Sequence, residues 1–121
     1  MPLKVLIVDD ALFMRNMLRR ILEGEGCEIV AEATNGVEAV EQFRLHSPDI
    51  VTMDIIMPVK NGIEALKEIL AINGGARVVM CSALGQEALV SEAREAGARD
   101  FILKPFDEVR VSEVITRLAG A

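Results

Sequence analysis

The sequence predicts an α/β fold in which five parallel strands form one sheet, with five helices on its two faces. Short continuous apolar runs alternate with segments of helical periodicity five times along the 121 residues. Apolar runs of this continuous kind are typical of strands covered on both faces, as in parallel sheets. Strands that alternate with helices form right-handed βαβ units. We therefore expect a single doubly wound domain that spans residues 1–121.

The first half of the chain supplies two strand–helix pairs. Leu6–Val8 is an apolar run and predicts the first strand. The helix that follows ends at Gly24, and its apolar stripe consists of Met14, Leu18, Ile21 and Leu22. Glu28–Ala33 is more polar, as expected of a strand at the edge of the sheet. Asn35, with Glu38 three residues later, resembles a capping box and predicts the start of the second helix.

The second half continues the same alternation. The remaining strands are predicted at Ile50–Met53, Val78–Cys81 and Phe101–Leu103. Asn61 and Glu64 repeat the capping pattern before the third helix, and Gly97 follows the fourth. The apolar stripes of the third and fifth helices are Ile63, Leu66, Ile69 and Leu70, and Val111, Val114, Ile115 and Leu118.

Composition excludes several classes of function. The net charge of −6 opposes binding to a phosphate backbone, and a chain without Trp or Tyr lacks the aromatic platforms on which single-stranded bases stack. Cys27 and Cys81 do not have the spacing of metal ligands. The apolar stretch near the N-terminus is too short for a signal peptide or a membrane span. We expect a reduced, cytoplasmic protein that binds neither nucleic acid nor membranes.

Five polar side chains follow the predicted strands at their carboxyl ends, where open α/β sheets bind their ligands. They are Asp9, Asp10, Asp54, Ser82 and Lys104. Each close pair of carboxylates repels by on the order of 4 kcal/mol at an effective dielectric constant of ~20, and a hard divalent cation offsets this best. Mg²⁺, an ammonium and a hydroxyl together suit the transfer of a phosphoryl group, and a carboxylate nucleophile would form an acyl phosphate.

At this point the chain resembles the receiver domain of two-component response regulators. The resemblance covers the whole chain and rests on Val8-Asp9-Asp10, Asp54-Ile55-Ile56-Met57-Pro58, Asn61-Gly62, Cys81-Ser82-Ala83 and Leu103-Lys104-Pro105-Phe106. It implies a flavodoxin-like sheet with strand order 2-1-3-4-5. Within the family, the chain is most similar to the stand-alone members that act in chemotaxis.

The resemblance also implies a role for each residue of the site. Asp54 would accept the phosphoryl group from a histidine kinase. Asp10, Asp54 and the backbone carbonyl of Ile56 would bind Mg²⁺ directly, and Asp9 would bind it through water. Lys104, joined to Pro105 by a cis peptide bond, would pair with the phosphoryl oxygens.

Two further residues would couple the site to the surface. Ser82 would hydrogen-bond the phosphoryl group, and Phe101 would rotate inward as the switch residue. This would reshape the face formed by the fourth helix, fifth strand and fifth helix so that it binds the flagellar motor switch or a phosphatase. We expect a monomeric switch rather than an enzyme. The alternative is a phosphorelay intermediate that donates to a histidine phosphotransfer protein.

Three other interpretations are weaker. A phosphatase of the haloacid dehalogenase type would need Asp-x-Asp after the first strand, whereas this sequence has Asp9-Asp10-Ala11. A flavin carrier would need a phosphate loop that is rich in Ser, Thr and Gly at the same place. The third interpretation is that the chain is a receiver domain taken from a longer regulator. Ile56 and Leu84 are apolar where the family tunes hydrolysis, so we expect a long-lived phosphorylated state.

Overall fold

A computed structural model describes residues 2–120 and contains the five strands and five helices that the sequence predicts. The strands are β1 (Lys4–Val8), β2 (Glu28–Ala33), β3 (Ile50–Asp54), β4 (Arg77–Ser82) and β5 (Asp100–Leu103). The helices are α1 (Leu12–Gly24), α2 (Gly36–His46), α3 (Gly62–Ile72), α4 (Glu87–Ala96) and α5 (Glu108–Ala119). None of the helices in this part of the chain has both the length and the apolar character that crossing a membrane requires.

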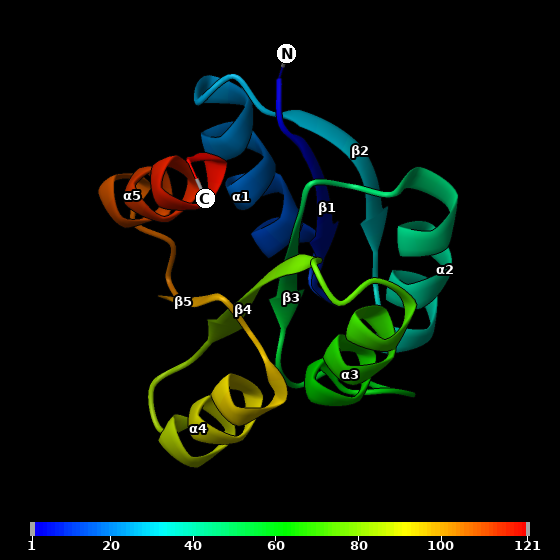
Figure 1. The fold of residues 1–121 in the computed structure, drawn as a ribbon. Helices are drawn as coiled ribbons and strands as arrows, with labels where there is room; N and C mark the ends of the chain where they lie inside the picture. Colours follow the sequence, from blue (N-terminus) through cyan, green and yellow to red (C-terminus); the bar gives the residue numbers. More distant parts are fainter. Residues whose placement is uncertain (1, 121) are drawn as a thin grey trace.

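All neighbouring strands are parallel, and their order is β2-β1-β3-β4-β5. This confirms the predicted order and the position of the polar strand β2 at an edge. α1 and α5 cover one face of the sheet, and α2, α3 and α4 cover the other (Figure 1). The two faces enclose separate apolar clusters, so side chains from alternate positions of each central strand pack in opposite layers.

The helix ends agree with the predicted caps. The side chains of Asn35 and Asn61 accept hydrogen bonds from the backbone N–H groups of Glu38 and Glu64, each at 2.9 Å. Gly97 follows α4 with φ of 114°, a left-handed conformation that glycine adopts without steric cost. These local signals set where α2 and α3 begin and where α4 ends. The starts of α2 and α3 lie at the carboxyl edge of the sheet, whereas the end of α4 leads into the amino end of β5.

Candidate functional site

The strand register brings the predicted site residues to one edge of the sheet. Val8 pairs with Met53, so Asp9 and Asp54 follow at the same level on neighbouring strands. Asp54 pairs with Cys81, and Ser82 pairs with Leu103. The Lys104 N–H then donates to the Ser82 carbonyl at 2.7 Å. Residues from four strands that are distant in sequence therefore meet at one edge.

Three carboxylates form the negative part of the site. Oxygens of Asp9, Asp10 and Asp54 all lie within 4.8 Å of one another. Asp9 and Asp54 are buried, with 3% and 7% of their surface exposed, whereas Asp10 is exposed. A cluster with one open side is suited to a cation that keeps some of its water molecules, which is the preference of Mg²⁺.

Lys104 supplies the positive charge. Its Nζ lies 2.6 Å from Oδ2 of Asp9 and 3.2 Å from Oδ2 of Asp54. Burial by itself would lower the pKa of Lys104, but the two carboxylates reverse this and raise the pKa above its ordinary value. The ammonium is therefore charged at neutral pH and bridges strands β1 and β3. It also lies beside the carboxylate that we expect to be the nucleophile.

The pKa of Asp54 is raised by its surroundings. Burial raises its pKa to about 6, although the Lys104 charge opposes the rise. The negative charges of Asp9 and Asp10 contribute to the rise. A cation that binds among the three carboxylates would remove this penalty. The chemistry of the donor set, the carboxylates of Asp9, Asp10 and Asp54, therefore fits Mg²⁺.

The loop after β3 is held close to the site by Gly62. The Gly62 N–H donates to the Ile55 carbonyl at 2.7 Å, which fixes the backbone next to Ile56. A Cβ atom at Gly62 would lie 2.0 Å from the Asp54 carbonyl oxygen, so only glycine allows this approach. The start of α3 thus packs directly on the backbone of the candidate nucleophile.

The other predicted residues lie around this center. Ser82 is buried at the end of β4, while the side chains of Ile56 and Leu84 are 56% and 82% exposed. The Lys104–Pro105 bond is cis, as the resemblance implied. Phe101 is half-buried, and the Arg94 guanidinium lies 4.7 Å from the centroid of its ring.

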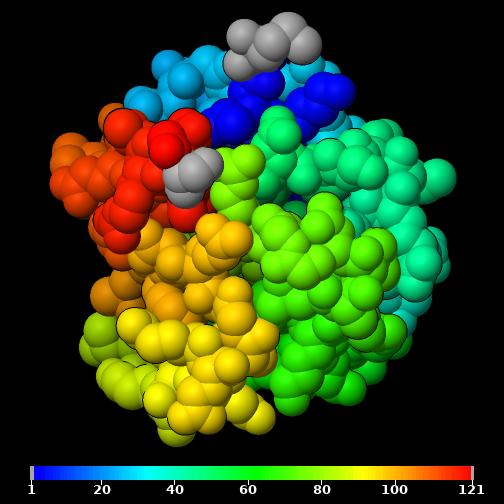
Figure 2. All heavy atoms as spheres, viewed as in Figure 1, coloured from blue at the N-terminus to red at the C-terminus, as the bar shows by residue number. Residues whose placement is uncertain are grey.

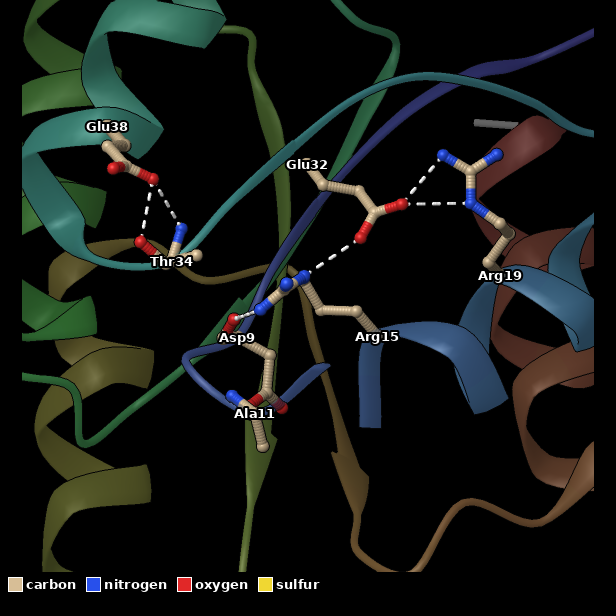
Figure 3. A network of polar contacts seen from close by, with 7 residues as sticks. All are labelled: Asp9, Ala11, Arg15, Arg19, Glu32, Thr34 and Glu38. Carbon is tan, nitrogen blue, oxygen red and sulfur yellow. Dashed lines mark hydrogen bonds and ion pairs between the residues drawn. The ribbon is translucent and has the colours of Figure 1, made fainter. Parts of the chain in front are cut away.

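Arg15 is a site neighbour that the sequence analysis did not identify. Its Nη1 donates to the Asp9 carbonyl at 2.7 Å, and its Nε donates to Glu32 at 2.8 Å (Figure 3). Arg15 lies outside the apolar stripe of α1, so the sequence predicts a solvent-exposed side chain. No spacing rule relates it to a glutamate in β2, so only the folded structure reveals the contact.

The sequence profile described as "Response regulator receiver domain" matches residues 5–116. The chain belongs to the response regulator receiver domain family. Among curated relatives, this receiver domain is 57% identical to the chemotaxis protein CheY of Bacillus subtilis (strain 168) over 114 residues, covering 94% of this chain and 95% of CheY. It is 55% identical to CheY of Thermotoga maritima over 116 residues, covering 96% of this chain and 97% of that one.

A solved structure is similar over nearly the whole receiver domain. A chain in the crystal structure of the CheX-CheY-BeF3-Mg²⁺ complex from Borrelia burgdorferi superposes with a TM-score of 0.93. It is 41% identical, and the match covers 98% of this chain and 90% of that one. The comparison confirms the flavodoxin-like topology. The CheY relatives support the chemotaxis branch that the sequence resembles.

Proposed function

We propose that this receiver domain is a phosphorylation-activated switch in which Asp54 accepts a phosphoryl group from a CheA-like histidine kinase. The single observation that carries the proposal is the position of the Asp54 carboxylate. It is buried at the end of the central strand, beside Asp9 and Asp10 and 3.2 Å from the Lys104 ammonium. A carboxylate in these surroundings has both a cation site and a fixed positive charge for the incoming phosphoryl oxygens.

In the proposed reaction, a carboxylate oxygen of Asp54 forms a bond to phosphorus while the bond from phosphorus to the donor nitrogen breaks. The donor imidazole keeps the electron pair of that bond. Bound Mg²⁺ would neutralise negative charge on the carboxylates and on the phosphoryl oxygens. Lys104 pairs with a phosphoryl oxygen and in doing so exchanges one of its present carboxylate partners. The product is an acyl phosphate on Asp54.

The output of the switch would be a change in the surface formed by α4, β5 and α5. Phosphorylation adds a charge of about −1.5 to −2 and three acceptor oxygens near Ser82. Movement of the Ser82 hydroxyl toward these oxygens would leave space that Phe101 can fill. In Figure 2, residues of α4, β5 and α5 form one adjoining strip, coloured from yellow to red. A partner on this strip can therefore sense the position of Phe101.

Chemotaxis is the proposed setting, supported by the CheY relatives. We propose a protein of the flagellar motor switch as the main partner, and a phosphatase such as a CheX-like protein as a second one. The switch would act as a monomer in the cytoplasm and would take up one phosphoryl group per molecule rather than turn over a substrate. If the phosphorylated protein does not bind the flagellar motor switch, the alternative is that it transfers its phosphoryl group to a histidine phosphotransfer protein.

Labelling with a small phosphodonor tests the acceptor. Acetyl phosphate with Mg²⁺ is expected to label the wild-type protein with a single equivalent, and chelation of Mg²⁺ should abolish labelling. Asp54→Ala should not be labelled. Asp49→Asn is a matched control, because Asp49 directly precedes the first residue of β3, at the opposite end of that strand from Asp54. Its carboxylate accepts a hydrogen bond from the Lys4 backbone N–H at 2.8 Å. Undiminished labelling of Asp54→Ala would refute the proposal.

Binding to a partner tests the output. Beryllofluoride with Mg²⁺ should increase affinity for a flagellar motor switch peptide in wild-type protein and leave Asp54→Ala unchanged. An unchanged affinity in wild-type protein, combined with phosphoryl transfer to a histidine phosphotransfer protein, would favour the phosphorelay alternative. Repeated hydrolysis of a phosphomonoester would instead indicate an enzyme.

A further inference from the structure

Asp9 is held by four contacts, which come from the end of β2, the start of α1 and the segment after β5. Its N–H donates to the Ala33 carbonyl at the end of β2 at 3.1 Å. One carboxylate oxygen accepts from the Ala11 N–H at the start of α1 at 2.9 Å, and the other accepts from Lys104 after β5 at 2.6 Å. Its carbonyl accepts from Arg15 in α1 at 2.7 Å. Three of the partner groups are the backbone groups of Ala33 and Ala11 and the side chain of Lys104, which is already assigned to the site. The fourth is Arg15.

Arg15 is itself fixed by a second contact. Its guanidinium uses Nη1 for the Asp9 carbonyl and Nε for Glu32, so a single planar group joins the end of β1 to β2 (Figure 3). The side chains of Arg15 and Glu32 are 12% and 25% exposed, so water competes weakly for these bonds. A forked guanidinium held at two points has little freedom to move.

Arg19 provides a natural comparison within the same network. It also pairs with Glu32, at 2.7 Å from Nη2, and with Glu23 at 3.2 Å. Figure 3 places Arg19 on the far side of Glu32 from Asp9, and within residues 2–120 Arg19 pairs with the carboxylates of Glu32 and Glu23. Arg15 and Arg19 therefore share an acid and a helix, but only Arg15 reaches Asp9.

We propose that Arg15, braced by Glu32, is a positioning residue that holds Asp9 in the geometry required to bind Mg²⁺. The inference rests on the proposed function and adds a residue that acts through the Asp9 backbone. Partners that orient a metal ligand commonly change metal affinity by about 10–100-fold when they are removed. The Asp9 carbonyl contact places Arg15 in that class.

The effect of charge on Mg²⁺ affinity is opposite to the effect of positioning, so a measurement of affinity separates the two. Replacing Arg15 by glutamine removes a positive charge near the acidic cluster, which by electrostatics alone would strengthen the binding of a cation. If positioning dominates, the same replacement weakens binding. The double variant Arg15→Gln with Glu32→Gln keeps the net charge of the wild-type protein, so its affinity reports positioning without a change in charge.

Titration calorimetry with MgCl₂ alone is the primary test. We expect Arg15→Gln to raise the Mg²⁺ dissociation constant about tenfold. The double variant should also bind more weakly than wild type, and Arg19→Gln should bind like wild type. Arg15→Lys keeps the positive charge but lacks the forked guanidinium that contacts both Asp9 and Glu32. Its Mg²⁺ dissociation constant should lie between those of wild type and Arg15→Gln. If Arg15→Gln does not fold, Arg15→Lys and the double variant carry the test.

A readout in metal-free protein distinguishes positioning from general loss of structure. Hydrogen exchange of the Ala11 amide, which donates to Asp9, should become faster in Arg15→Gln and remain unchanged in Arg19→Gln. Equal Mg²⁺ affinity of wild type and Arg15→Gln, or equal losses in Arg15→Gln and Arg19→Gln, would overturn the inference. A wild-type protein that does not bind Mg²⁺ would instead overturn the proposed function.

Discussion

Gly62 lies in direct contact with the backbone of Asp54, and its hydrogen in place of a Cβ atom is what makes this contact sterically allowed. The contact links the first turn of α3 to the last residue of β3. A change at residue 62 therefore alters both the packing of a helix on the sheet and the orientation of the candidate nucleophile. The same site depends on Lys104, which is held by Asp9 and Asp54 together.

Gly62→Ala should be strongly destabilising. The added methyl group would lie 2.0 Å from the Asp54 carbonyl oxygen, so the loop or the helix must shift. We expect a loss of about 2 kcal/mol or more in the free energy of unfolding, measured by urea denaturation, as for other overpacked positions. Gly74→Ala is the control, because its nearest neighbour would be the Leu70 carbonyl at 3.8 Å. A Gly62→Ala protein as stable as Gly74→Ala would contradict the structure.

Val59→Asn should stabilise the protein. Val59 has φ of 69° and is 84% exposed. A β-branched residue in this left-handed conformation is strained, and its side chain is not buried, so burial does not offset the strain. Asparagine tolerates this conformation, and we expect a gain of about 1 kcal/mol in the free energy of unfolding. Val109→Asn is the control, since Val109 is exposed within α5 and has ordinary helical geometry. An equal effect of both substitutions would exclude relief of strain.

Asp54→Asn should change the pH dependence of stability in the absence of Mg²⁺. Because the folded-state pKa of Asp54 is raised to about 6, its protonated form stabilises the fold, and this contribution disappears as pH rises through 6. The amide introduced by Asp54→Asn does not ionise, so this variant does not lose this stability as pH rises. Asp54→Asn should therefore match wild type near pH 4 and be more stable by about 2 kcal/mol at pH 7.5.

Thermal unfolding at a series of pH values, with chelator present, measures the difference between Asp54→Asn and wild type. The difference should grow between about pH 4 and pH 7 and then remain constant. Added Mg²⁺ should stabilise wild type in proportion to the logarithm of its concentration, with a smaller effect on Asp54→Asn. A stability difference that does not vary with pH would exclude titration of Asp54 as its cause.

Ile56→Asn should shorten the lifetime of the phosphorylated state. The exposed, apolar side chains of Ile56 and Leu84 have no group that can orient a water molecule toward phosphorus. An amide at residue 56 could donate to or accept from such a water. Release of phosphate from purified phosphorylated protein should be faster in Ile56→Asn than in wild type, while Ile56→Leu should resemble wild type. Faster release from the wild type would refute the hypothesis of a long lifetime.

The candidate site could be predicted because the apolar runs in the sequence show where each strand ends. The apolar runs before Asp54 and Ser82 located the carboxyl edge of the sheet, and the rule that ligands bind at this edge brought Asp9 and Lys104 into one cluster. Strand order is not contained in periodicity, and it came from the resemblance to a family. The folded structure confirms the strand order and places the three carboxylates and Lys104 together.

Other features could not be predicted from local patterns. The contact of Arg15 with Glu32 joins residues that are 17 positions apart on different elements, and the side chains match only after α1 packs beside β2. The stacking of Arg94 on Phe101 depends in the same way on the packing of α4 against β5. The conformation of Val59 opposes the preference of valine, so a propensity argument would have placed another residue there.

The pairing of Asp9 with Lys104 joins positions that are 95 residues apart. A ribosome adds Asp54 and both of its acidic neighbours well before it adds Lys104, and β5 is the last of the five described strands in chain order. A nascent polypeptide that ends before residue 104 therefore lacks the ammonium that pairs with Asp9 and Asp54 in the folded protein. The acidic cluster thus acquires its positive partner only after the strand that precedes Lys104 has been synthesised.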